Sequence, residues 1–170
     1  MNRLQQHERW MREALREAER ALQEGEVPVG AVVVANNHVV GRGHNRVEAL
    51  QDATAHAEIL AITAASNTLF TWRLDQADLY VTLEPCIMCA GAVLNARLRR
   101  VVYGASDPQV GACGSVFNIV QDPRHRWHVD VVSGILAERC SELLNAFFQE
   151  KRRLRKRATK EDRSTSSAGG

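Results

Sequence analysis

The sequence predicts a three-layer α/β/α fold, in which helices cover both faces of a mixed, five-stranded sheet. Strand-like and helix-like stretches alternate along the chain, and the first two strands follow each other as a hairpin. No linker or internal repeat divides the 170 residues. Hairpins pair antiparallel strands whereas helical crossovers join parallel ones, so we expect the sheet to be mixed.

In the first half of the chain, residues 5–24 carry apolar side chains at helical spacing and predict a helix that ends at a glycine. The apolar, β-branched run 29–35 predicts a buried strand, and a turn of two asparagines joins it to a second strand over 38–42. A polar loop then leads to a helix over 54–66, with Thr54 as its expected N-cap.

In the second half, the apolar run 79–83 predicts a third strand. A helix is expected over 85–97, with a proline at its first position. Two further strands are expected over 99–103 and 129–132, separated by a glycine-rich and then irregular loop. A final helix is expected over 136–155.

The positive charge is concentrated near the C-terminus. Residues 151–163 contain eight basic and two acidic side chains, a net charge of +6; the whole chain carries +2 and the last seven residues none, so the rest carries −4. We expect one domain over 1–156, with a basic helix end at 151–156, and a disordered tail over 157–170. Such a basic stretch is typical of an arm that meets a polyanion, and equally of a solubilising tail.

Composition indicates a cytoplasmic protein with no membrane partner. Hydrophobic residues make up 45% of the chain, but no apolar run approaches the ~20 residues that span a bilayer. The polar N-terminus lacks the apolar segment of a signal peptide. In this setting a Cys-x-x-Cys pair is more often metal-binding or redox-active than a disulfide. Cys113 and Cys140 stand alone and are expected to be ordinary buried residues.

Two short motifs carry the chemistry. His56 and Glu58 begin the helix expected over 54–66, and Cys86 and Cys89 lie on one face of the later helix. One imidazole with two thiolates is a ligand set of catalytic zinc, which keeps its fourth position for water and lowers the pKa of that water to ~7. Glu58 lies near the metal without needing to bind it, so it can transfer the proton.

Each motif alone has a plainer interpretation. A His-x-Glu sequence occurs on many surface helices, and a single Cys-x-x-Cys can be redox-active or half of a structural zinc site. Structural zinc sites are closed by four ligands and have no use for an additional carboxylate. The two motifs together therefore favour a catalytic zinc.

The order His-x-Glu followed by Pro-Cys-x-x-Cys resembles the signature of the zinc-dependent nucleobase deaminases. Within that class, the sequence is similar to the bacterial tRNA-specific adenosine deaminases over about residues 10–153. The stretches that carry this resemblance are EVPVGAVVV at 26–34, TAHAEI at 54–59, TLEPCIMCAGA at 82–92 and GACGS at 111–115.

The resemblance implies a cytidine-deaminase-like fold, a homodimer and one Zn²⁺ ion per subunit. It implies that His56, Cys86 and Cys89 bind the zinc and that Glu58 moves the proton. The implied reaction is the hydrolytic conversion of adenosine to inosine at the wobble position of an arginine tRNA.

Contacts to RNA are also implied by the resemblance. The backbone amide of Ala57 and the side chain of Asn45 would hold the flipped nucleotide, and Asp107 would meet the adjacent RNA backbone. The last helix would lie along the anticodon stem-loop through Phe147, Phe148, Lys151 and Arg152. From the residues alone, Asn45 could instead stabilise a loop, Asp107 could cap a turn, and the two phenylalanines could belong to the core.

Two positions depart from the family. Ala53 replaces a common proline, which makes the loop less rigid, and Gln109 replaces a frequent lysine, which removes a possible phosphate contact. Two rival functions are a deaminase of free cytosine, guanine or nucleosides, and a non-catalytic zinc module that binds RNA. The loop at Asp107 and the basic last helix argue against the first rival. Glu58 and the missing fourth ligand argue against the second.

Overall fold

The computed structural model describes residues 1–167, with only the backbone described at 162 and 164–167. Its elements, in chain order, are α1 (Arg3–Gln23), β1 (Gly30–Ala35), β2 (His38–His44), α2 (Val47–Leu50), α3 (Ala57–Leu69), β3 (Ala77–Leu83), α4 (Ile87–Asn95), β4 (Arg100–Ala105), β5 (Asp130–Val132) and α5 (Ala137–Ser167).

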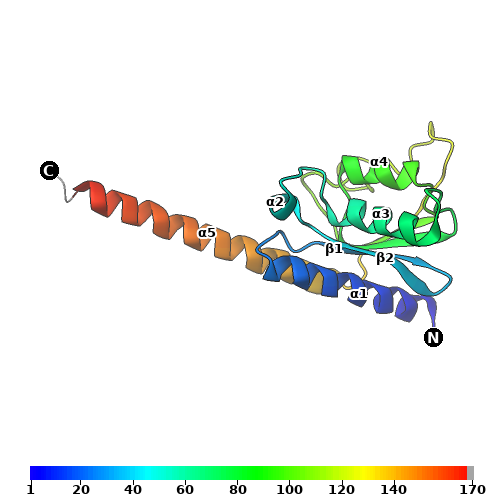
Figure 1. Ribbon diagram of the computed structural model, residues 1–170, viewed down its shortest axis with the longest axis horizontal. Coiled ribbons are helices and arrows are strands. Elements are labelled where there is room, and N and C mark those ends of the chain that lie inside the picture. The colour runs from blue at the N-terminus through cyan, green and yellow to red at the C-terminus, as the bar shows by residue number, and fades with distance from the viewer. Residues whose placement is uncertain (168–170) are drawn as a thin grey trace.

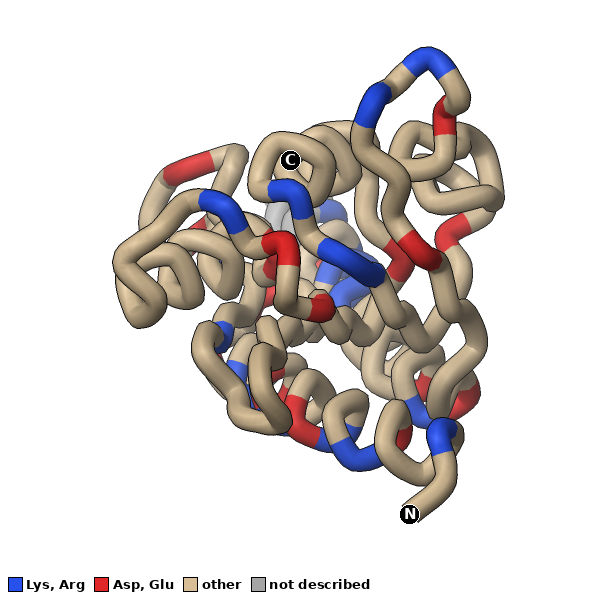
Figure 2. Tube along the Cα trace, turned by 90° about the vertical axis from the view of Figure 1, so that its right-hand side faces the viewer, with Lys and Arg blue, Asp and Glu red and all other residues tan. Residues whose placement is uncertain are grey.

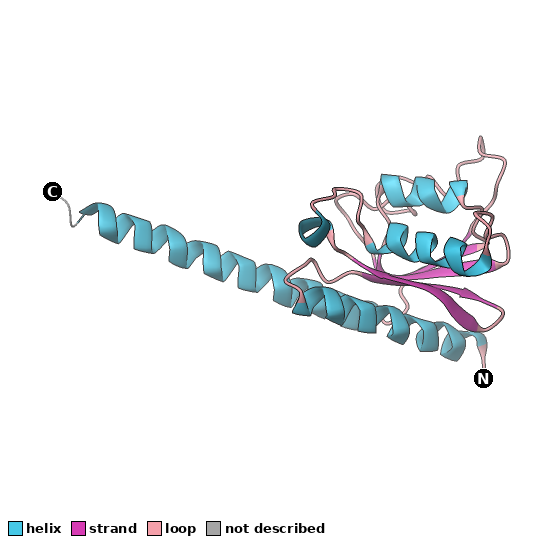
Figure 3. Cartoon of the chain, viewed as in Figure 1, coloured by secondary structure: helices cyan, strands magenta, loops and turns pink. Residues whose placement is uncertain are grey.

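The sheet is mixed and has five strands, as the sequence predicts. Its strand order is β2-β1-β3-β4-β5; β1 is antiparallel to both of its neighbours, whereas β3, β4 and β5 run parallel. Helices α3 and α4 cover one face, and α1 and the first part of α5 cover the other (Figure 1; Figure 3). The predicted three layers are therefore confirmed.

The central strand β1 shows why its sequence reads as one apolar run. All of its residues are buried, because helices cover both faces of the sheet. Side chains alternate along a strand, so Val33 packs in the layer under α3 and α4 while its neighbour Val32 packs in the layer under α1. Both layers are apolar, and this makes β1 the centre of the core.

Helix α3 lies unusually close to strand β2 because two glycines of the strand face it. A Cβ atom built on Gly43 would lie 2.3 Å from the backbone oxygen of Ala57, and one on Gly41 would lie 2.3 Å from that of Ala61. The helix contributes small residues, including Ala65, along the same face. This close approach holds the first turn of α3 at a fixed height above the sheet.

Both helices that carry the motifs begin later than the sequence predicts. Helix α3 starts with His56 as its N-cap, not Thr54, because the amide and hydroxyl of Thr54 donate instead to Asp52 at 2.8 and 2.7 Å. Helix α4 starts with Cys86 as its N-cap, so Pro85 precedes the cap and is not the first helical residue. Neither cap side chain bonds the helix amides, so the usual preference for Ser, Thr, Asp or Asn does not apply.

The loop before α3 and the last helix also differ from expectation. The polar loop contains the short helix α2, and α5 continues to Ser167 although the sequence predicts its end at about Arg155 and disorder over 157–170. Lys, Arg, Glu and Ala are strong helix formers, and α5 contains no glycine or proline, so its charged composition does not stop the helix. Residues 168–170 of that predicted tail lie outside the described residues.

The extension of α5 projects well beyond the body of the domain (Figure 1). Seen from the end of the molecule that lies opposite this extension, acidic and basic positions are interspersed over the body (Figure 2). Within residues 1–167, no helix combines the length and the apolar character needed to cross a membrane.

We predict that Gly43→Ala destabilises the protein by ~1–3 kcal/mol, because the new methyl group must push α3 away from β2. The matched control is Gly91→Ala in α4, where an added Cβ meets no atom within 4 Å. Alanine favours a helix over glycine, so the control is expected to be neutral or stabilising by up to ~1 kcal/mol. Urea unfolding of the metal-loaded proteins measures both; equal effects of the two substitutions would contradict the close-approach explanation.

Candidate metal and active site

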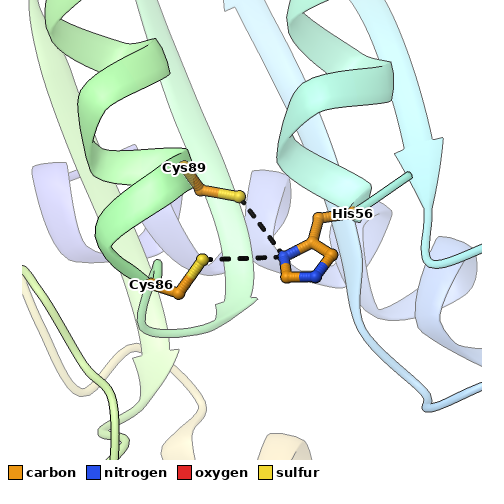
Figure 4. A group of neighbouring side chains, drawn as sticks. All are labelled: His56, Cys86 and Cys89. Carbon is orange, nitrogen blue, oxygen red and sulfur yellow. Dashed lines mark hydrogen bonds between the residues drawn. The ribbon is translucent and has the colours of Figure 1, made fainter. Parts of the chain in front are cut away.

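The three predicted metal ligands meet at the starts of α3 and α4 (Figure 4). His56 and Cys86 are the N-cap residues of the two helices, and Cys89 lies in the first turn of α4. His56 Nδ1 is 3.7 Å from Cys86 Sγ and 3.5 Å from Cys89 Sγ. All three ligand atoms lie within 4.8 Å of one another.

These distances fit one tetrahedral zinc ion. With Zn–S and Zn–N bonds of about 2.3 and 2.0 Å, tetrahedral angles separate sulfur from nitrogen by about 3.5 Å. His56 Nδ1 lies at nearly this distance from both sulfurs. Thiolates with an imidazole are also a donor set that zinc favours. The residues present therefore fit a three-ligand metal site that leaves one coordination position open.

The two thiols share one proton in the metal-free site. The pKa of Cys86 is lowered to about 3, mainly because Cys89 and then His56 donate hydrogen bonds to its thiolate. The pKa of Cys89 is raised, because its proton is held by Cys86 and because the side chain is buried. A metal needs both sulfurs as thiolates, so metal binding must displace the proton that Cys89 keeps.

Glu58 stands beside this triad as a buried carboxyl group that the ligand set does not need. Its side chain is 4% exposed, and burial, which disfavours the charged form, raises its pKa to about 7. A group with a pKa near neutrality can both accept and donate a proton. Its position and its pKa therefore suit the predicted role in proton transfer.

A cavity of about 300 Å³ is lined by Glu58 and by two of the metal ligands, His56 and Cys86. It joins residues from distant parts of the chain: Asn45 after β2, Ala57 at the start of α3, Asp107 after β4 and Lys151 in α5. The first amides of a helix lack intrahelical partners, so the N–H of Ala57 is available to a ligand. The structure thus brings the three predicted substrate-binding residues into one cavity, and their roles stay predictions.

Asn45 is held by a carboxylate that sequence reasoning missed. Glu26 is 2% exposed and accepts hydrogen bonds from Asn45 Nδ2 at 3.3 Å and from the amide nitrogens of Glu48 and Ala49 at 3.3 and 2.7 Å. Glu26 therefore ties the loop after β2 and helix α2 to the cavity wall. The available signal was an acidic residue a few positions before a buried strand.

Asp107 lies in a loop organised by a second missed carboxylate, Glu84. This buried side chain accepts from the amides of Asp107, Cys113 and Ser115 at 3.0–3.1 Å, and from the Ser115 hydroxyl. Asp107 Oδ1 in turn accepts from the amides of the second and third residues after it, at 3.0 and 3.3 Å, so Asp107 does cap a turn. Its second oxygen makes none of these bonds.

The residues expected on the last helix divide into two groups. Phe147 is buried, with the ammonium of Lys151 5.0 Å from its ring centre, whereas Phe148 is 42% exposed. Lys151 borders the cavity, but Arg152 faces a separate groove along the α5 extension. Contact of these four residues with RNA stays a prediction, and Phe147 has little free surface for it. Cys113 and Cys140 are buried, as predicted.

Comparison with known proteins gives consistent matches. Residues 5–152 match the model of the MafB19-like deaminase family. The tRNA-specific adenosine deaminase of Bacillus subtilis (strain 168) is 50% identical over 155 residues, which cover 91% of this chain and 96% of that protein. A solved structure from work on A-to-I editing by tRNA:A34 deaminases at the wobble position of transfer RNA is 46% identical, with a TM-score of 0.77, and covers 80% of this chain and 99% of that one.

A more distant match is the guanine deaminase from Nitrosomonas europaea. Its structure is 27% identical to this chain, with a TM-score of 0.69, and the match covers 82% of this chain and 83% of that one. Proteins that act on a free base and on tRNA thus share one architecture, so the fold alone does not select the substrate.

We predict that iodoacetamide at pH 6 modifies Cys86 first in the metal-free protein, since Cys86 is half-buried and its lowered pKa keeps it as a thiolate. Burial raises the pKa of Cys113 to about 12 and that of Cys140 to about 11, so both should resist labelling. Added zinc should protect Cys86. Peptide mass spectrometry measures each site, and equal labelling of all cysteines, or no protection by zinc, would contradict the proposed ligand set.

Proposed function

The chain belongs to the MafB19-like deaminases and, among the deaminases, to the tRNA-specific adenosine deaminases, and we propose from this that its cavity converts adenosine to inosine at the wobble position of a tRNA. Its five-stranded sheet, with helices on both faces, has the cytidine-deaminase-like fold of that family. One observation carries the proposal: two of the three metal ligands, His56 and Cys86, border the same cavity as Glu58 and the residues expected to hold the substrate. The resemblance of the sequence suggests an arginine tRNA, and a tRNA substrate suggests the cytoplasm.

We propose one zinc ion per subunit, held by His56, Cys86 and Cys89. When bound, zinc supplies a water molecule whose pKa is low enough to provide hydroxide at neutral pH. The buried Glu58 accepts the proton from that water and delivers it to the amino group, which leaves the base as ammonia. Water adds to the purine ring and ammonia departs, so adenosine becomes inosine without any other reactant.

The cavity walls hold the base while this exchange occurs. Its volume of about 300 Å³ is at the small end of ligand pockets and suits one flipped nucleotide. Because Asn45 Nδ2 donates to Glu26, its Oδ1 remains free to accept a hydrogen bond from the nucleotide. The N–H of Ala57 donates from the other side, and Asp107 meets the RNA next to the flipped base.

We also propose that the protein is a homodimer through the outer faces of α3 and α4. Glu58 is the only charged residue in these two helices, and it is buried. A shallow groove between them is lined by the half-buried Ile59 and Ile62, and Trp72 at its edge is 60% exposed. A helical surface without charges and with an exposed aromatic side chain is typical of a contact between subunits.

The likeness to a guanine deaminase keeps a small-molecule substrate as the second candidate. Lys151 at the cavity favours RNA, because a neutral free base gains nothing from a cation there. The basic residues that follow it on α5 extend the same charge away from the cavity. A nucleic-acid backbone that runs from the cavity along α5 would meet Lys151 and these basic residues one after another.

The direct test is incubation of the purified protein with total tRNA, followed by an inosine assay at the wobble position, beside a panel of free bases and nucleosides. We predict inosine in tRNA and little turnover of the panel. Glu58→Gln should keep its zinc but lose roughly 10²–10⁴-fold in rate, as expected for removal of a general acid–base group. Turnover restricted to free guanine or cytosine, or a fully active Glu58→Gln protein, would contradict the proposal.

A second prediction concerns the α5 extension. Replacing Arg152, Arg155 and Lys156 by glutamine should raise KM for tRNA and leave kcat and zinc content nearly unchanged. Each lost phosphate contact should also make the salt dependence of kcat/KM shallower, by about 0.9 in the logarithmic slope. The control removes three arginines from the exposed side of α1, at positions 12, 16 and 20. Identical tRNA kinetics in the two triple variants would show that the extension does not bind RNA.

A further inference from the structure

A second polar cavity lies at the end of the sheet opposite the metal site. It has a volume of about 220 Å³ and is formed by the first turns of α1, the β1–β2 turn and the beginnings of β3 and β4. Asp78, near the start of β3, borders this cavity, whereas Leu83, at the end of the same strand, borders the catalytic one. At about 3.3 Å per residue, the two cavities are about 17 Å apart along the strand. This second cavity therefore plays no direct part in the deamination.

The floor of this cavity contains a buried histidine with an unused nitrogen. His7 is 5% exposed, and its Nδ1 lies 2.9 Å from the hydroxyl of Tyr80. Among the described residues, His7 Nε2 has no hydrogen-bond partner, although it is buried. A buried polar atom without a partner costs free energy, so such an atom indicates a partner that binds from outside the chain.

The cavity also has an excess of positive charge. Arg3, Arg99 and Arg100 border it. Asp78 accepts hydrogen bonds from Arg99 at 2.9 and 3.0 Å and from Arg100 at 3.3 Å, so one carboxylate serves two guanidinium groups. Arg100 also reaches the exposed Asp130 at 3.3 Å, whereas no ion pair involves Arg3 in the described part of the chain. Two carboxylates thus face three guanidinium groups, and only one of those carboxylates borders the cavity.

The state of His7 agrees with a donor that points into the cavity. Burial, and then the charge of Arg100, lower the pKa of His7, so the imidazole is neutral at pH 7 and carries one N–H. If Nδ1 accepts from the Tyr80 hydroxyl, the proton is on Nε2, which then donates into the cavity. Burial also raises the pKa of Tyr80 to about 12, so its hydroxyl keeps its proton.

We propose that this cavity binds a phosphoryl anion, either free phosphate or the phosphate of a mononucleotide, at a site separate from the catalytic one. Arg3 and Arg100 supply guanidinium donors, which match tetrahedral oxyanions, and His7 Nε2–H supplies a third contact. The cavity is smaller than the pockets of drug-sized ligands, so the phosphate itself is the part that it encloses. Several guanidinium groups around one small cavity favour a doubly charged phosphate over a singly charged carboxylate.

Calorimetric titration of the zinc-loaded, full-length protein with inorganic phosphate tests the site, with ionic strength held constant by chloride. We expect saturable binding of one phosphate per chain that weakens roughly tenfold or more in Arg3→Gln. Arg3 is exposed, so this variant should fold normally. The matched control Arg12→Gln removes the same charge from the same helix outside the cavity and should bind phosphate as the wild type does.

Adenosine 5′-monophosphate and acetate are titrated in parallel. Tighter binding of the nucleotide identifies a nucleotide site, and tighter binding of phosphate identifies a free-phosphate site.

Nitrogen-15 NMR of the histidine rings locates the bound phosphate. The ring signals of His7 should shift with the same titration curve as the calorimetry, while those of His56 at the metal site stay in place. Absence of saturable binding, equal affinity in Arg3→Gln, equal binding of acetate, or a shift at His56 without one at His7 would each overturn the proposal. Absence of saturable binding would leave water as the partner of His7 Nε2.

Discussion

The site depends on the meeting of two helix starts. His56 and Cys86 are thirty residues apart in the chain, yet their ligand atoms lie 3.7 Å from each other because both occupy the N-cap positions of neighbouring helices. The glycines of β2 set the position of α3 against the sheet, and β3 leads directly into α4. At both caps the side chain turns towards the other helix and does not satisfy its own helix amides. Each helix start therefore lacks a stabilising side-chain cap, and its cap residue instead contributes a ligand to the metal site. The N–H of Ala57, in the first turn of α3, stays available to a ligand.

Three buried glutamates surround the same cavity, and their surroundings give them different roles. Glu84 is also buried, but its four hydrogen bonds from the loop after β4 outweigh that burial and lower its pKa. Glu58 has no such set of donors, so burial dominates and its pKa rises to about 7. Glu26 binds amides in the manner of Glu84. One carboxyl group thus has a pKa that suits the proposed proton transfer, while the other two hold the loops that carry Asn45 and Asp107.

The metal triad, Glu58 and the order of strands and helices could be predicted because local residue patterns carry them. The helix starts were misplaced by a few residues because His56 and Cys86 cap helices without the side-chain bond that prediction relies on. Glu26 and Glu84 were missed because their partners are backbone amides of remote loops, which no sequence pattern reports. The phosphate-sized cavity was missed for a similar reason, since four separate segments form it. The length of α5 was underestimated because the low-complexity end of the chain was taken as a sign of disorder, although nothing in the sequence of α5 breaks a helix.

The central claim is that the two helix starts hold one zinc ion with three protein ligands and one open position. Zinc X-ray absorption spectroscopy of the purified protein tests this most directly. The account predicts two sulfur neighbours at about 2.3 Å and two nitrogen or oxygen neighbours at about 2.0 Å, with one of the latter exchangeable for an added anion. Four tightly bound protein ligands, or a sulfur count other than two, would contradict it.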